Sequence, residues 1–119
     1  MINITRSQSE YLKAIYVISH AEKVTITKIA DFLKYKKPSV IKALRYLDDL
    51  GLIIYTHELI ELTDQGLVYI KNLNRRYDIL QKFFVDILKI NPELAKKDAE
   101  NIRCSVSCYT ITQLEKYLR

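Results

Sequence analysis

The sequence predicts a mostly α-helical fold with one small β-hairpin. Its 119 residues include only two Gly and two Pro, which leaves few positions for long loops. Apolar residues recur at helical spacing along most of the chain. The exception is a pair of short β-like runs, residues 52–55 and 59–62, which are joined by a tight turn.

Three helices are expected before the hairpin. Ser7 and Glu10 fit the S-x-x-E capping box, so Ser7 is predicted to cap the first helix and Glu10 to reach back to it. Thr27 is predicted to cap the second helix. Pro38 is predicted at the first position of the third, where its missing N–H costs nothing, and Gly51 is expected to end it in the left-handed conformation. Three helices followed by a hairpin form a winged helix-turn-helix.

A helical C-terminal part is expected after the hairpin. Thr63 is predicted to cap a helix over residues 64–88, which is longer than most helices of globular proteins. Asn91 and Ser107 are predicted to cap two further helices. The predicted domains are a winged helix over residues 1–71 and a helical dimerisation domain over residues 72–119.

The C-terminal helices carry more apolar surface than three short helices can bury. The surplus is concentrated at Phe83, Phe84, Val85, Ile87 and Leu88. A symmetric contact with a second copy would cover this surface, so the sequence predicts a homodimer through the C-terminal helices. Such a pair would present two recognition helices about one turn of DNA apart.

The charge balance favours a polyanionic partner. The net charge is +5 and the pI is about 9.2, although a merely basic protein is an equal alternative on charge alone. No apolar run reaches the ~18 residues of a membrane span, and the first residues lack the apolar core of a signal peptide. The expected location is therefore the cytoplasm, with no membrane partner.

Several short strings, spread over nearly the whole chain, carry a family resemblance. They are Glu10-Tyr11-Leu12, Ile15-Tyr16, Ile29-Ala30, Pro38-Ser39-Val40, Leu62-Thr63 with Gly66, and the turn at Ser107. Together they resemble the diphtheria-toxin-repressor and manganese-transport-regulator family of metal-dependent transcriptional repressors. The resemblance implies a homodimeric repressor that binds a palindromic operator in double-stranded DNA when metal is bound.

The stretch of residues 34–47 is expected to contact DNA. It carries five positive charges and no acidic residue, and it opens a predicted helix that could enter the major groove. Lysines here can neutralise phosphates, and Lys42 is placed to reach a guanine edge. At the positions where the resembled family contacts DNA, the chain has Thr27, Lys28, Lys36, Lys37, Pro38, Ser39 and Lys42, with Arg45 one turn further.

The metal-ligand positions of the resembled family are altered in this sequence. The family uses carboxylates and histidines, with a Cys or Met in some members. Lys13 and Arg103 are cations, which repel a divalent ion and donate no lone pair. The sequence therefore predicts a regulator without the usual metal control and without a bound cofactor. The matching positions are Glu10, Lys13, Tyr77, Glu100, Arg103 and Cys104.

Three interpretations of these positions stay open. In the first, Lys13 and Arg103 replace the charge of the metal by pairing with Glu10 and Glu100. In the second, a rearranged site binds a divalent transition metal such as Mn, Fe or Zn. In the third, the residues are ordinary surface. The rearranged site would consist of Glu10, Asp78, Glu100 and Cys104.

Two further alternatives concern the cysteines and the partner. Cys104 and Cys108 are expected to be small apolar side chains at a tight corner, and the sharper alternative is a thiol switch. No catalytic motif is present, so an enzyme is not expected. The rival to DNA binding is a winged helix used for protein contacts, because Tyr35 and Tyr46 place aromatic rings among the lysines.

Overall fold

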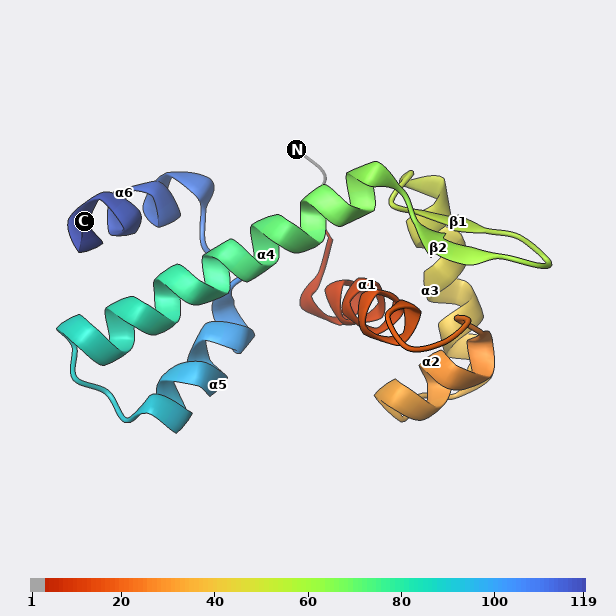
Figure 1. Cartoon of the computed structure of the whole chain (residues 1–119), viewed down its shortest axis with the longest axis horizontal. Coiled ribbons are helices and arrows are strands. Elements are labelled where there is room, and N and C mark those ends of the chain that lie inside the picture. Colours follow the sequence, from red (N-terminus) through yellow and green to blue (C-terminus); the bar gives the residue numbers. More distant parts are fainter. Residues whose placement is uncertain (1–3) are drawn as a thin grey trace. The chain divides into compact units, whose positions relative to one another are not determined.

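The computed structural model describes residues 4–119. They form six α-helices, a two-stranded antiparallel hairpin and one turn of π-helix, which confirms the predicted fold class (Figure 1). The chain divides into two compact units, one that extends to Ile70 and one that begins at Lys71. Within residues 4–119, none of the helices combines the length and apolar character needed to cross a membrane.

The first unit contains three helices and the hairpin. The helices are α1 (Arg6–Ser19), α2 (Ile26–Leu33) and α3 (Lys37–Asp49), and the strands are β1 (Ile53–Tyr55) and β2 (Ile60–Leu62). The strands pair in antiparallel register, as the predicted hairpin requires. The α2–α3 pair is the helix-turn-helix, and the hairpin is the wing.

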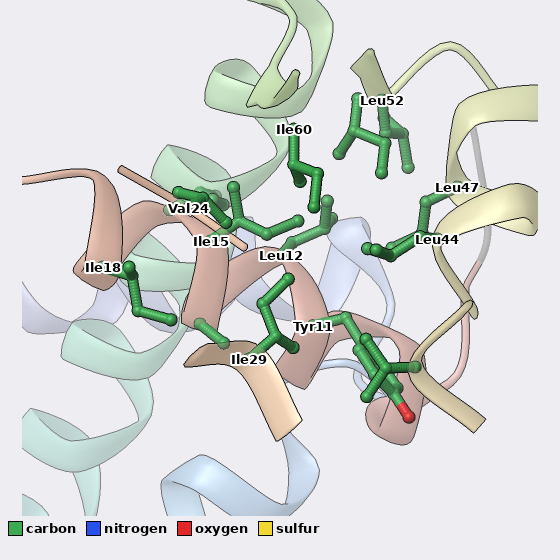
Figure 2. Packing of buried hydrophobic residues seen from close by; sticks show 14 of the residues in the cluster. Tyr11, Leu12, Ile15, Ile18, Val24, Ile29, Leu44, Leu47, Leu52 and Ile60 are labelled. Carbon is green, nitrogen blue, oxygen red and sulfur yellow. The ribbon is translucent and has the colours of Figure 1, made fainter. Parts of the chain in front are cut away.

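One apolar core joins these elements (Figure 2). Leu12 and Ile15 of α1 are fully buried, as are Leu44 and Leu47 of α3 and Ile29 of α2. Burying one such side chain contributes roughly 1.5–3 kcal/mol. Because α3 supplies several of these residues, the core sets which face of α3 turns inward.

α1 begins two residues earlier than predicted, so the proposed Ser7–Glu10 capping box is wrong. Thr5 is the capping residue: its hydroxyl accepts a bond from the Gln8 N–H at 3.1 Å, and Gln8 Oε1 accepts one from the Thr5 N–H at 2.9 Å. Thr5 and Gln8 fit the same box as Ser7 and Glu10, and the earlier start gives a longer helix. Glu10 consequently has no capping role.

α2 also begins earlier than predicted. Thr25, rather than Thr27, caps it by accepting a bond from the Lys28 N–H at 3.2 Å. Thr25 satisfies the same capping preference and extends the helix by two residues. In α3, Pro38 lies at the second helical position instead of the first. This position is still in the first turn, where backbone N–H groups have no partner within the helix, so proline is tolerated. Gly51 follows α3 with the expected positive φ, +78°.

The second unit is helical. α4 begins in the first unit and continues into the second; Thr63 caps it by accepting a bond from the Gly66 N–H at 3.1 Å, as predicted. The predicted caps Asn91 and Ser107 are also confirmed. Ile79, Leu80, Ala99 and Ile111 form the buried apolar cluster of this unit. Its elements are α4 (Asp64–Lys82), the π-helical turn η1 (Phe83–Ile87), α5 (Pro92–Ile102) and α6 (Cys108–Leu118).

Gly66 is expected to tolerate no side chain. A Cβ at this position in the first turn of α4 would lie 2.1 Å from the carbonyl oxygen of Leu52. Gly66→Ala should therefore lower the free energy of unfolding by about 2 kcal/mol or more, measured by urea denaturation.

Gly51→Ala is the matched control. Its cost comes from the positive φ, about 1 kcal/mol, because the nearest contact is the flexible Gln65 side chain at 3.3 Å. A Gly66→Ala protein as stable as the Gly51→Ala protein would contradict the steric explanation.

Candidate nucleic-acid interface

α3 separates a buried apolar face from an exposed basic one. Val40, Leu44 and Leu47 are completely buried, and the period of 3.6 residues turns the intervening side chains to solvent. We call these exposed residues the α3 basic face; they are Lys36, Lys37, Ser39, Lys42 and Arg45. Pro38 is exposed beside them. The structure thus brings six of the eight predicted DNA-binding residues together on one helix.

The N-terminus of α3 lacks a capping side chain. Lys36 occupies the cap position and accepts no bond through its side chain, and Asp and Glu are absent from the first turn. The positive end of the helix dipole is therefore balanced by neither a cap nor an acid. An uncapped, lysine-rich helix start is a favourable place for a phosphate group.

The two predicted DNA-binding residues on α2 differ in how accessible they are to DNA. Thr27 is exposed. Lys28 is half-buried, and its Nζ donates to the carbonyl of Lys23 at 2.7 Å and lies 3.5 Å from the Glu22 carboxylate. Because these contacts already engage the ammonium, Lys28 offers less unpaired charge to DNA than Lys36 or Lys37 does.

Arg45 marks the boundary between the α3 basic face and the wing. It lines a groove of about 350 Å³ together with Lys23 at the approach to α2 and with the hairpin residues His57 and Glu58. The wing tip therefore carries one acid and one histidine, and it adds little fixed positive charge to the surface.

The turn between α2 and α3 is attached to α1. The Tyr35 hydroxyl donates a hydrogen bond to Glu10 Oε2 at 3.0 Å, and the Tyr35 ring packs against Tyr11 with centroids 5.7 Å apart. This bond to the carboxylate is the main cause that raises the pKa of Tyr35 above its ordinary value. Glu10 is one of the positions that match the metal ligands of the resembled family, and here it contacts the helix-turn-helix.

The C-terminal unit holds four of the six altered positions, namely Tyr77, Glu100, Arg103 and Cys104. Burial, followed by the negative charges of Glu100 and Asp78, raises the pKa of Tyr77, and the positive charge of Arg103 opposes this shift. Glu100, Asp78 and Arg103 therefore each lie within electrostatic reach of Tyr77. Arg103 is only 8% exposed and Cys104 is half-buried.

This donor set fits a divalent ion poorly, because a phenol and a guanidinium stand where ligands are needed. Among residues 4–119, no three or more His, Cys, Asp or Glu side chains are grouped so that they could hold a metal ion. Glu10 and Lys13 belong to the first unit, and Lys13 is exposed. The predicted charge pairs and the rearranged site, which combine residues of both units, stay predictions.

Arg76 is a buried cation that the sequence analysis missed. It is 6% exposed; Nη1 donates to the carbonyl oxygens of Arg103, at 2.8 Å, and Val106, and Nη2 donates to Cys108 Sγ at 3.0 Å. These bonds tie α4 to the turn between α5 and α6. The spacing from Leu73, three residues before, was the available signal that position 76 faces inward.

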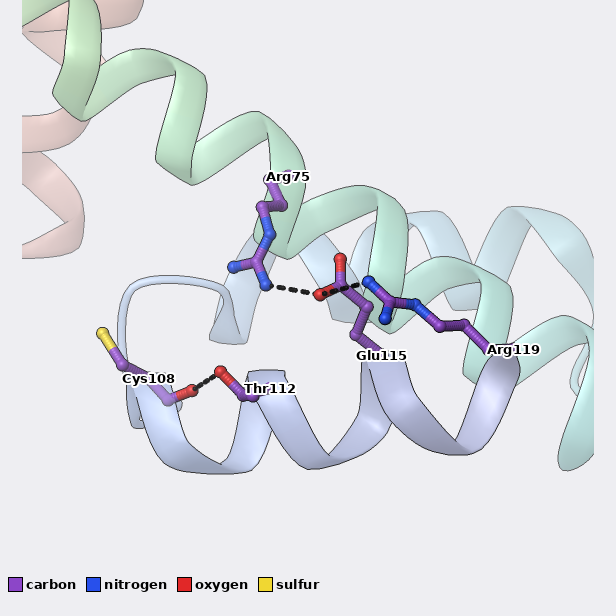
Figure 3. A network of polar contacts seen from close by, with 5 residues as sticks. All are labelled: Arg75, Cys108, Thr112, Glu115 and Arg119. Atoms are coloured by element: carbon purple, nitrogen blue, oxygen red, sulfur yellow. Dashed lines mark hydrogen bonds and ion pairs between the residues drawn. The ribbon is translucent and has the colours of Figure 1, made fainter.

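The neighbouring Arg75 instead joins an exposed network (Figure 3). It donates to Glu115 Oε1 at 2.9 Å, and Arg119 lies 3.6 Å from the same oxygen. The bond from Arg75 is the main cause that lowers the pKa of Glu115. Exposed ion pairs of this kind contribute little stability.

Comparisons with known proteins cover both units. The model of the iron dependent repressor N-terminal DNA binding domain matches residues 3–60, and that of the iron dependent repressor metal binding and dimerisation domain matches residues 63–119. A search of curated proteins found no match.

The solved structures that resemble this chain include metal-dependent regulators. The metal-dependent transcriptional regulator MtsR is 27% identical with a TM-score of 0.81, over 97% of this chain and 54% of that one. ScaR with bound Zn²⁺ is 27% identical with a TM-score of 0.83, over 93% and 53%. A hypothetical protein from Sulfolobus solfataricus, 22% identical with a TM-score of 0.87 over 97% and 89%, shares the fold. The chain thus spans about half the length of the two named regulators.

Arg76→Lys is expected to destabilise the C-terminal unit. Lysine cannot reproduce the guanidinium contacts with two carbonyls and a thiol, so the buried Arg103 carbonyl and two part-buried acceptors would lose their donor. The free energy of unfolding should fall by about 2 kcal/mol, measured by denaturation.

Arg75→Lys is the matched control, because the same substitution one residue away affects an exposed pair and should change stability by less than about 0.5 kcal/mol. Equal effects of the two substitutions would show that Arg76 has no special structural role.

Proposed function

The chain belongs to the iron-dependent repressor family of transcriptional regulators, and we propose that it binds a palindromic operator in double-stranded DNA as a homodimer, without the usual metal control of that family. Its two units correspond to the DNA-binding domain and to the metal-binding and dimerisation domain of the family. Of the similar proteins, MtsR is described as a metal-dependent transcriptional regulator, and the structure of ScaR contains bound Zn²⁺.

The observation that carries the proposal is the α3 basic face. The core fixes its orientation, no acidic side chain interrupts it, and the helix start is uncapped. Lys36 and Lys37 would neutralise phosphates, while Ser39 and Lys42, further along the helix, would reach base edges in the major groove. Arg45, beside the wing groove, would contact the DNA backbone.

The proposed independence from metal rests on Arg103. This buried guanidinium lies near Glu100 and Tyr77 in the unit where the family binds its ion. A covalently attached cation cannot dissociate, so a positive charge is present here at every metal concentration. Pairing of Lys13 and Arg103 with Glu10 and Glu100, which would connect the first helix to the fifth, remains part of this proposal.

The proposed dimer contact is an apolar groove of the second unit. It measures about 410 Å³ and lies between η1 and α6, where the Phe83 and Tyr117 rings pack 6.2 Å apart. Tyr109 and Tyr117 are 65% and 67% exposed, and Ile87 is 40% exposed. A second copy is the proposed occupant because this unit matches the dimerisation domain of the family.

DNA binding is tested by titrating duplex DNA at several salt concentrations. The Lys36→Ala/Lys37→Ala protein should bind more weakly, and the log–log dependence of its affinity on salt should be shallower by about 3.6 for the dimer, since two phosphate contacts are lost in each protomer and each lost contact removes about 0.9. Lys96→Ala/Lys97→Ala, with the same charge change on exposed positions of α5, should leave the slope unchanged.

The same titration with EDTA tests metal independence, and the expected affinity for DNA is unchanged. Stoichiometric metal in the purified protein, whose removal abolishes binding, would contradict this part. If no salt-dependent DNA binding occurred under any condition, the winged helix would instead be a protein-interaction module. Binding-site selection should return a palindrome.

The dimer contact is tested by sedimentation. Tyr109→Glu should shift the protein toward the monomer, because it places a charge in the apolar groove. Val68→Glu, a residue of similar exposure (66%) in the first unit, should leave the association unchanged. A Tyr109→Glu protein that associates like its parent would rule out this groove as the dimer contact.

A further inference from the structure

We propose that Glu10 is a positioning residue for the DNA-contacting end of α3, and that it acts through the hydroxyl of Tyr35. The two residues connect α1 to the turn of the helix-turn-helix by the 3.0 Å hydrogen bond described above. The inference rests on the proposed function, because it assumes that the α3 basic face contacts DNA.

The backbone of the turn is fixed on its α2 side. Lys34 adopts a left-handed conformation with φ of 61°, and the Tyr35 N–H bonds to the carbonyl of Ala30 at 3.0 Å. Lys36 and Lys37 come directly after Tyr35, and neither receives a capping bond from a side chain. The side chain of Tyr35, the residue before these lysines, attaches this end of α3 to α1.

Both parts of the Tyr35 side chain contribute to that attachment. The ring lies on Tyr11, and the hydroxyl is held by Glu10, the residue that precedes Tyr11 on α1. The ring alone would leave the turn free to slide along Tyr11, whereas the directional bond to the carboxylate fixes its position. The raised pKa of Tyr35 agrees with a phenol that keeps its proton in this bond.

Glu10 is available for this role because α1 is capped by Thr5 and Gln8. The carboxylate that matches a metal ligand of the family is thus bonded to the turn that leads into Lys36 and Lys37. In this chain, the first helix reaches the DNA-contacting end of α3 through a tyrosine, and no ion is needed for that connection.

The test measures affinity for duplex DNA in EDTA. Tyr35→Phe keeps the ring and removes only the hydroxyl, and Glu10→Ala removes the acceptor; each should weaken binding about fivefold. The double variant should be no weaker than Tyr35→Phe alone, because that variant has already lost the bond to Glu10. Glu10→Gln retains an acceptor oxygen and should restore most of the affinity. Tyr16→Phe, on α1 like Glu10, is the control that should not change it.

A second measurement separates positioning from stability and from the function itself. The backbone amide NMR signals of Lys36 and Lys37 should shift in Tyr35→Phe, with the melting temperature unchanged. Parent-like affinity in Tyr35→Phe, or additive losses in the double variant, would overturn the proposal. If the parent protein did not bind DNA, the proposed function would fail, and unshifted amide signals in Tyr35→Phe would then overturn the positioning role separately.

Discussion

The packing of α3 against α1 is the contact on which the DNA-binding unit depends. Leu44 and Leu47 meet a core to which α1 contributes Leu12 and Ile15, and all four are fully buried. Rotating α3 would expose these leucines and bury lysines. The free-energy cost of that change is far larger than the stabilisation from any single surface contact. The exposed charges therefore have a fixed direction before any partner arrives, and only the end of the helix requires local attachment.

The second unit buries two arginine side chains, Arg76 and Arg103. Arg76 is satisfied by carbonyl oxygens and a thiol, so it acts as a hydrogen-bond donor that closes the α5–α6 turn. Arg103 is buried near Glu100 and Tyr77, and its carbonyl oxygen is one of the acceptors of Arg76. The unit that matches the metal binding and dimerisation domain of the family thus buries two guanidinium groups, whose positive charge is permanent.

The fold was predictable because its signals are local and repeated. Apolar spacing and the caps at Thr63, Asn91 and Ser107 identified the helices of the second unit. The predicted start of α1 was wrong because two possible capping boxes overlap there. Thr5 and Ser7 satisfy the same local rule, and only the folded structure shows which of them caps the helix. The Tyr35–Glu10 bond joins residues 25 positions apart, and no periodicity encodes such a pair.

The π-helical turn η1 determines which apolar side chains of the second unit face solvent. Its Leu88 N–H bonds five residues back to Phe83, so this turn holds about one residue more than an α-helical turn. That extra residue rotates the next side chains by roughly 100° relative to an uninterrupted helix. Ile87 and Leu88 point to solvent while Phe84 packs on the core cluster. The length of the chain at this point, and not only its composition, determines which apolar side chains a second molecule can meet.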